Sequence, residues 1–174
     1  MLKLLTGAAV ALVVAAPIAI APAFAAGGDT TTPSCKAGEV YDQAKQRCVP
    51  KSSSLDTDSL FETGRALAYE GRYDEAIDVL KLAEDRNDPR VLNMLGYSHR
   101  KQGHLLIGLG YYEEALRIDP DHVLTREYMG EAFLQMGDLA SARKQLEEIA
   151  ERAGADSREY GELAAHIAAF EERG

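Results

Sequence analysis

Apolar residues along most of the chain recur every three or four positions, the spacing that predicts amphipathic helices. The clearest example is the segment 108–121, GLGYYEEALRIDPD, where Leu109, Tyr112 and Leu116 share one face and charged residues occupy the other. The Asp-Pro-Asp sequence at 119–121 ends this helix because proline disfavours the helical conformation in the residue before it. The same pattern predicts helices at 59–69, 73–85, 90–102, 105–118, 123–135 and 139–152.

Glycines mark a repeat within this helical pattern. One series consists of Gly71, Gly103 and Gly137, which follow one another at nearly equal intervals. A second series lies seven positions earlier in each segment and consists of Gly64, Gly96 and Gly130. Two glycine series in one register are hard to obtain by chance, so they indicate repeated units of two helices each.

A period of roughly 34 residues with two helices per unit resembles the tetratricopeptide repeat, or TPR. The second unit matches the family pattern best, with small residues at Gly96 and Gly108, a large apolar residue at Tyr112, a later small residue at Ala115 and a closing Pro120. All three units depart from the pattern at one place, because the aromatic residue expected early in each first helix is replaced by Leu60, Leu92 and Arg126. The resemblance implies an all-α solenoid of three repeats, at 58–88, 89–122 and 123–154.

The segment that follows the third repeat predicts a capping helix. A helix pair cannot bury its apolar face alone, so stacked repeats need a covered end. Residues 156–172, DSREYGELAAHIAAFEE, open with Asp156 or Ser157 as the N-cap and carry one apolar stripe through Leu163 and Ile167. The capping segment is assigned to 155–174.

The N-terminus has the pattern of a signal peptide at 1–25. Lys3 precedes an apolar run at 4–20, and the Ala-Phe-Ala sequence at 23–25 satisfies the rule for a cleavage site. An uncleaved membrane anchor is the alternative. We expect cleavage after Ala25, no stable membrane insertion afterwards, and a location in a bacterial periplasm, with secretion as the second choice. A linker at 26–34 follows.

Cys35 and Cys48 are the only cysteines, and twelve residues separate them. In an oxidising compartment this pair predicts a disulfide, worth about 3 kcal/mol for a loop of this size in the entropy model. A redox role would favour a C-x-x-C spacing, and a metal site would need more ligands. The predicted parts are two strands at 40–42 and 47–49 within a hairpin at 35–49, and a linker at 50–57.

Catalytic and cofactor motifs do not emerge from the sequence. No H-E-x-x-H, G-x-S-x-G or Walker pattern occurs, and the four histidines show no spacing that brings two together. We therefore predict no enzyme, no cofactor and no metal. The net charge of −9 argues against nucleic acid and anionic membrane surfaces as partners.

The resemblance implies that the first helices line a concave surface where ligands bind. A protein or peptide is therefore the expected partner. The inward positions predicted from the family pattern are Arg65, Tyr69, Asn93, Tyr97, Arg100, Lys101, Glu127, Tyr128 and Glu131.

The basic residues Arg65, Arg100 and Lys101 are the unusual members of this set, because the protein is acidic. Guanidinium groups beside an asparagine are suited to hold a carboxylate or an acidic peptide segment, and tyrosines offer flat contact area. Alternatively, these are solvated charges that pair with nearby acids. The carboxylate clamp known in some members of the family would need basic residues where Glu127 and Glu131 stand, so we expect a ligand that is acidic at one end and basic at the other.

The leading functional hypothesis is an exported adaptor that binds a peptide or protein in this groove. Two alternatives stay open. One is a homo-oligomerising scaffold that associates through the capping helix or a second-helix face. The other is binding of envelope polysaccharide through the Cys35–Cys48 hairpin.

Overall fold

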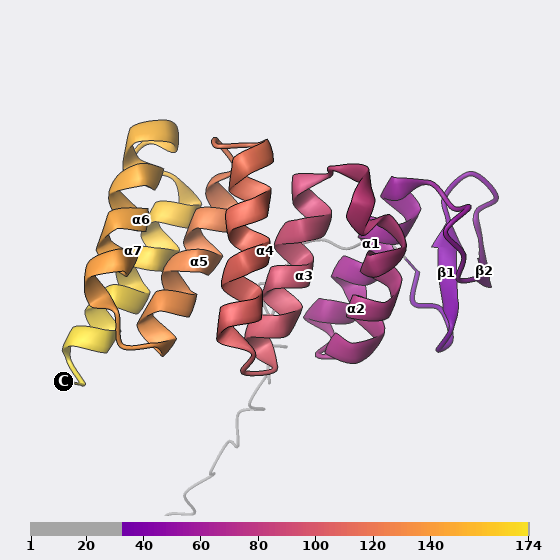
Figure 1. Ribbon diagram of the computed structural model, residues 1–174, viewed down its shortest axis with the longest axis horizontal. Helices are drawn as coiled ribbons and strands as arrows, with labels where there is room; N and C mark the ends of the chain where they lie inside the picture. Colours follow the sequence, from indigo (N-terminus) through magenta and orange to yellow (C-terminus); the bar gives the residue numbers. More distant parts are fainter. Residues whose placement is uncertain (1–32, 174) are drawn as a thin grey trace, which may run out of the picture.

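The computed structural model describes residues 33–173, which form a row of paired helices with a small hairpin at one end (Figure 1). The predicted signal peptide and most of the predicted linker at 26–34 lie outside the described residues. Two antiparallel strands, β1 (Glu39–Asp42) and β2 (Arg47–Pro50), come first. The helices are α1 (Thr57–Tyr69), α2 (Tyr73–Leu80), α3 (Pro89–Lys101), α4 (Leu105–Ile118), α5 (Val123–Gln135), α6 (Leu139–Ala153) and α7 (Arg158–Glu171).

This architecture confirms the predicted helical solenoid with its preceding disulfide hairpin. Polar side chains cap the starts of several helices: Asp56 accepts a hydrogen bond from the amide of Ser59, and Ser157 accepts one from the amide of Tyr160. Pro89 occupies the first turn of α3, where its missing N–H leaves no hydrogen bond unmade.

The predicted helix at 73–85 is wrong in its last part. The α-helix ends at Leu80, and a 3₁₀ helix continues through Lys81–Arg86. Asn87 then adopts a left-handed conformation with φ of 55° before Asp88 and Pro89 begin α3. A 3₁₀ helix rises about 2.0 Å per residue against about 1.5 Å in an α-helix, so this winding lets a repeat shorter than the other two reach the next helix pair.

The two glycine series have different physical causes. Gly71, Gly103 and Gly137 follow the first helix of each repeat with φ of 78°, 85° and 79°, a conformation that favours glycine. Gly96 and Gly108 instead allow α3 and α4 to touch. A Cβ at Gly108 would lie 2.9 Å from the carbonyl oxygen of Gly96, which is closer than real Cβ contacts come.

The hairpin closes the N-terminal end of the solenoid, and Cys35 is disulfide-bonded to Cys48 as predicted. Val40 is fully buried with the core of the first repeat. The amide of Tyr41 donates to Thr63 Oγ1 at 3.2 Å, which ties β1 to α1. The hairpin is therefore docked on the first repeat.

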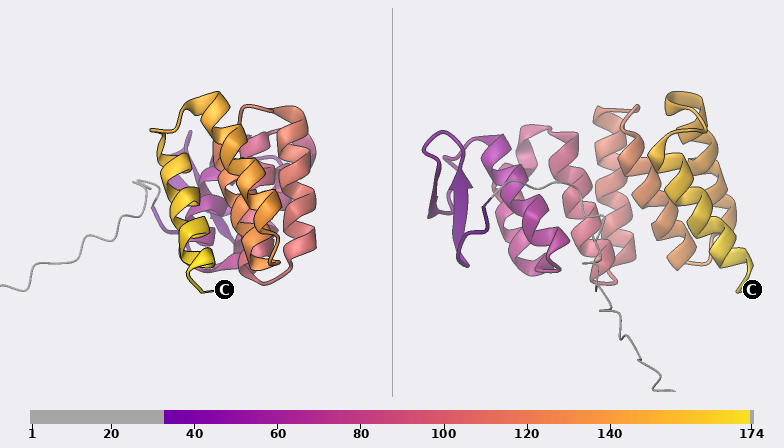
Figure 2. Two further views of the ribbon diagram at one scale, coloured as in Figure 1. Left: turned by 90° about the vertical axis from the view of Figure 1, so that its left-hand side faces the viewer. Right: turned by 180° about the vertical axis from the view of Figure 1, so that it is seen from behind.

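Helix α7 closes the opposite end, and Figure 2 shows the hairpin and α7 at the two ends of the molecule. Leu163 is fully buried, and Ile167 is nearly so. Leu163 packs where a side chain on Gly130 would stand, 2.6 Å from the Cβ position. The predicted capping helix is confirmed, with Ser157 rather than Asp156 as its N-cap.

Residues 33–173 contain no helix that is both long enough and apolar enough to span a bilayer. Within the same residues, no cluster of three or more histidine, cysteine, aspartate or glutamate side chains could coordinate a metal ion.

Candidate ligand-binding groove

A groove of about 690 Å³ runs across one side of the solenoid. It is lined by side chains of α1, α3 and α5, by the residue before α5, and by Arg158 at the start of α7. We call it the first-helix groove. Its lining residues include Phe61, Glu62, Arg65, Tyr69, Arg90, Asn93, Met94, His122, Leu124, Tyr128 and Arg158.

Three tyrosines from three first helices form one cluster, and two of them, Tyr69 and Tyr128, line the groove. The rings of Tyr69 and Tyr97 lie 5.7 Å apart in an edge-to-face arrangement, and those of Tyr97 and Tyr128 lie 5.0 Å apart. Lys101, also predicted here, is exposed, and its Nζ lies 5.8 Å from the ring centroid of Tyr97. Tyr69 keeps 41% of its surface exposed, whereas Tyr128 keeps 9%, and their hydroxyls are 3.3 Å apart. The cluster therefore links α1, α3 and α5 and leaves the Tyr69 ring accessible to a ligand.

Arg100, predicted at the groove surface, is instead buried, with a side chain only 1% exposed. Its guanidinium donates to Glu131 Oε2 at 2.8 Å and to the hydroxyl of Tyr112 at 3.2 Å, and Tyr112 is itself fully buried. It also lies 5.5 Å from the ring centroids of Tyr97 and Tyr128. Both Arg100 and Glu131 are therefore committed to holding helices together, so the predicted contact from Arg100 to a ligand carboxylate is wrong.

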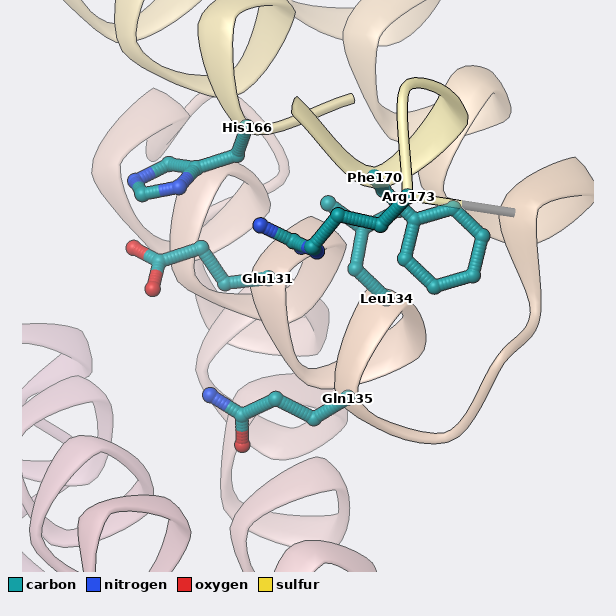
Figure 3. Close-up of a pocket in the computed structure, with 6 residues that line it drawn as sticks. All are labelled: Glu131, Leu134, Gln135, His166, Phe170 and Arg173. Carbon is teal, nitrogen blue, oxygen red and sulfur yellow. The ribbon is translucent and has the colours of Figure 1, made fainter. Parts of the chain in front are cut away.

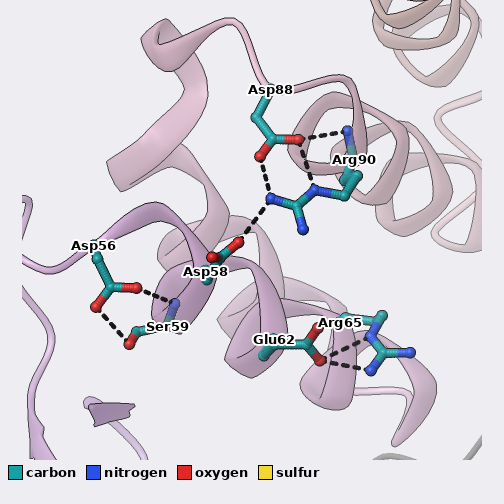
Figure 4. Close-up of polar contacts among 7 residues, drawn as sticks. All are labelled: Asp56, Asp58, Ser59, Glu62, Arg65, Asp88 and Arg90. Atoms are coloured by element: carbon teal, nitrogen blue, oxygen red, sulfur yellow. Dashed lines mark hydrogen bonds and ion pairs between the residues drawn. The ribbon is translucent and has the colours of Figure 1, made fainter. Parts of the chain in front are cut away.

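The other arginines at the N-terminal half of the groove are also paired with acids (Figure 4). Arg65 bonds Glu62 on the same helix at 2.5 Å. Arg90 bonds Asp58 and Asp88, each at 2.7 Å. These contacts agree with the alternative in which the basic residues pair with nearby carboxylates, and they leave no concentrated positive charge there for an acidic ligand.

Two buried acceptor oxygens near the groove have no hydrogen-bond partner among the described residues: Asn93 Oδ1 and Glu127 Oε2. Asn93 is 1% exposed and lines the groove, and Glu127 is 6% exposed. Glu127 lies on α5 between Leu124 and Tyr128, which both line the groove. Burial, with the nearby charge of Glu131 as a second cause, raises the pKa of Glu127 to about 7.

Comparison with known families identifies the repeat. One model described as "Tetratricopeptide repeat" matches residues 89–122, and a second with the same description matches 108–167. The matched segment, residues 89–167, therefore consists of tetratricopeptide repeats. Neither match includes the divergent repeat at 58–88, which the structure nevertheless folds into the helix pair α1 and α2. No curated protein matches the TPR chain in sequence.

Solved TPR structures share this fold. The first TPR of Spaghetti (RPAP3), bound to the HSP90 peptide SRMEEVD, has a TM-score of 0.58 at 18% identity, over 67% of this chain and 91% of that one. The Yersinia enterocolitica chaperone SycD, in complex with a peptide of the translocator YopD, gives 0.56 at 24% identity, over 67% and 89%. The Sgt2 TPR domain from Aspergillus fumigatus gives 0.59 at 21% identity, over 72% and 89%.

The contribution of α7 to the groove was not predicted from the sequence. The sequence pattern predicted only that this helix caps the solenoid. Arg158 lines the groove, and α7 packs against α5 as well as α6. It therefore occupies the place of the first helix of a fourth TPR unit. The signal was present in the repeat period, because a small residue, Ala164, follows Gly130 by the same interval that separates Gly96 from Gly130.

A second cavity of about 500 Å³ lies between α5 and α7. Figure 3 shows the side chains of Glu131, His166 and Arg173 pointing toward this space, with Leu134 and Phe170 beside it. The third-repeat end of the TPR surface is therefore lined by both polar and apolar side chains.

The raised pKa of Glu127 predicts how stability depends on pH. The folded-state pKa, about 7, lies above the ordinary value of 4.5, so the wild type loses stability as pH rises from 4.5 through 7. Glu127→Gln removes this loss. One pKa unit corresponds to about 1.4 kcal/mol, and local relaxation around the charged carboxylate reduces the effect, so we expect the variant to gain about 1 kcal/mol at pH 8.5 and almost nothing at pH 4.5.

Urea unfolding of the wild type and Glu127→Gln at both pH values measures this difference. Glu147→Gln, at an exposed position on α6, is the matched control and should leave the difference near zero. If Glu127→Gln gained the same unfolding free energy at both pH values, the Glu127 carboxylate would not be charged and buried at high pH, and the account would be contradicted.

Proposed function

We propose that this TPR protein is a non-enzymatic interaction module of the bacterial periplasm that binds an extended segment of a partner protein in the first-helix groove. The observation that carries the proposal is the groove itself. An accessible tyrosine and a buried, unpartnered asparagine oxygen belong to the lining of one cavity, which side chains from four helices enclose. Aromatic surface and a few placed polar groups are the elements that ligand-binding clefts use.

The solved TPR structures support this proposal through their ligands. RPAP3 is bound to an HSP90 peptide, and SycD is bound to a peptide of YopD. Their identity to this chain, 18% and 24%, shows a shared fold. The proposal that this chain also binds a peptide rests on its own groove.

Export is supported by two independent features of the chain. The first is the signal-peptide pattern at residues 1–25. The second is the disulfide between Cys35 and Cys48, a bond that persists in oxidising compartments and is rare in the cytosol.

Self-association is a second candidate, favoured by an apolar patch on α4. Leu106 is 74% exposed and Ile107 is 51% exposed, although both are large apolar residues. Ile107 also borders a cavity of about 480 Å³ with Leu92 and Tyr111. This patch lies on a second helix, so a ligand mapped to the first-helix groove and a copy docked on α4 are experimentally distinguishable. No comparable observation favours polysaccharide binding by the hairpin, which stays a prediction from the sequence.

Peptide selection tests the proposal. Random decapeptides displayed on phage are selected against the purified protein, and the affinities of synthetic versions are measured by calorimetry. Tyr69→Ala should weaken binding about 10-fold or more, because a flat exposed aromatic in a cleft is a typical hot spot. Leu106→Ala on α4 is the matched control and should change affinity less than about 2-fold. The reverse pattern would contradict groove binding and favour the α4 patch.

A further inference from the structure

The surface around Glu127 carries more acids than bases. Glu127 is influenced by Glu131 on its own helix and by Arg158, Glu159 and Glu162 on α7. The positive charges in this region are already engaged, since Arg158 bonds Glu159 at 3.0 Å and Arg100 bonds Glu131 at 2.8 Å. Arg158 attracts the Glu127 carboxylate from a distance, but among residues 33–173 no cation bonds Glu127 directly.

The hydrogen bonds that Asn93, in the groove lining, and Glu127, beside it on α5, leave unmade point in the same direction. Both unpartnered groups, Glu127 Oε2 and Asn93 Oδ1, are acceptors. A buried carboxylate oxygen without a donor is costly, because it has lost its water without gaining a replacement. A ligand that brings hydrogen-bond donors to Asn93 Oδ1 and Glu127 Oε2 is therefore favoured. A cationic donor is favoured most at the Glu127 carboxylate.

We propose that the first-helix groove recognises a partner segment carrying a lysine or arginine side chain, which donates to Glu127, while a backbone N–H of the same segment donates to Asn93 Oδ1. This inference rests on the proposed function and names the chemistry of its ligand. It differs from the sequence-based expectation, in which the arginines would hold a carboxylate.

An acidic ligand fits this groove poorly. Arg65 and Arg90 are each paired with carboxylates of the protein, so a ligand carboxylate would have to compete with them. It would also meet the acids of α5 and α7. The peptide SRMEEVD in the RPAP3 structure contains three acidic residues. Because of the acids on α5 and α7, we expect this chain to prefer a ligand of the opposite charge.

Binding of a cation at Glu127 should depend on pH. The pKa of Glu127 is about 7 in the free protein, so the carboxyl is mostly neutral at pH 5.5 and mostly charged at pH 8. The charged groups that face it are Glu131 on α5 and Arg158, Glu159 and Glu162 on α7, with Arg100 of α3 beyond Glu131. Affinity for a cationic segment should therefore rise between pH 5.5 and pH 8.

The experiment is a double-mutant cycle on peptides selected from the random decapeptide library at pH 8. We expect lysine or arginine at one enriched position. Replacing that residue by glutamine should weaken binding to the wild type about 10-fold, and to Glu127→Gln less than about 2-fold. Glu147→Gln is the matched control and should behave as wild type. Lowering the pH from 8 to 5.5 should weaken wild-type binding about 5-fold or more and leave Glu127→Gln nearly unchanged.

Each outcome separates the inference from the proposed function. Peptides whose binding is lost in Tyr69→Ala, but which carry no basic position or show no coupling to Glu127, would overturn the cationic site and leave groove binding intact. If the library yields no peptide, or only peptides insensitive to Tyr69→Ala, groove binding fails and the cationic site fails with it.

Discussion

Replacing Arg100 with methionine should lower the free energy of unfolding by about 3 kcal/mol. The side chain is 1% exposed and donates to both Glu131 and Tyr112. Methionine fills a similar volume but donates no hydrogen bond, so it would leave the Glu131 carboxylate without its cation and the buried Tyr112 hydroxyl without its partner. Denaturant unfolding followed by circular dichroism measures the change.

Arg65→Met is the matched control for Arg100→Met. Arg65 is also an arginine on a first helix and also pairs with a glutamate, but its side chain is 25% exposed. A partly exposed ion pair contributes less than about 1 kcal/mol, so this variant should unfold almost as the wild type does. If the two variants were equally stable, Arg100 would be a surface group after all and available to a ligand.

Replacing Gly108 with alanine should lower the free energy of unfolding by about 2 kcal/mol, within the usual range for overpacking a close contact. The added methyl would lie 2.9 Å from the carbonyl oxygen of Gly96 and 3.3 Å from the backbone nitrogen of Arg100. These are backbone atoms of α3, so the helices must separate to admit it. Thermal and urea unfolding both report the loss.

Gly110→Ala tests the same substitution two positions away on the same helix. Nothing lies within 4 Å of a Cβ at Gly110, and alanine favours the helix by up to about 1 kcal/mol over glycine. This variant should be as stable as the wild type or slightly more so. If Gly108→Ala and Gly110→Ala lost similar unfolding free energy, the close contact between α3 and α4 would not be the cause of the destabilisation.

The repeat was predictable from the sequence because its causes are local. Proline at 89 and 120 limits which residues can be helical, and the glycines at Gly71, Gly103 and Gly137 take a turn conformation that other residues rarely adopt. The disulfide followed from two cysteines and their spacing. Each of these signals acts over a short stretch of chain.

The burial and pairing of the groove side chains were not predictable from the sequence, because they depend on which helices pack against one another. Arginine is normally a surface residue, and nothing next to Arg100 in the sequence shows that α4 approaches closely enough to bury it. The same holds for Glu127, because charged groups of α7, a helix distant from it in the sequence, act on its carboxyl. Family position placed both residues on inward-facing helices, but only the packing of four helices decides which of them a ligand can reach.

The most direct test of the account is to map a selected peptide onto the protein by NMR. Amide shifts are recorded for the ¹⁵N-labelled protein as peptide is added. Binding in the first-helix groove predicts that the perturbed amides cluster on α1, α3 and α5, around Tyr69, Asn93 and Glu127. Perturbations that instead centre on Leu106 and Ile107 of α4, with the first helices unchanged, would contradict the groove as the binding site.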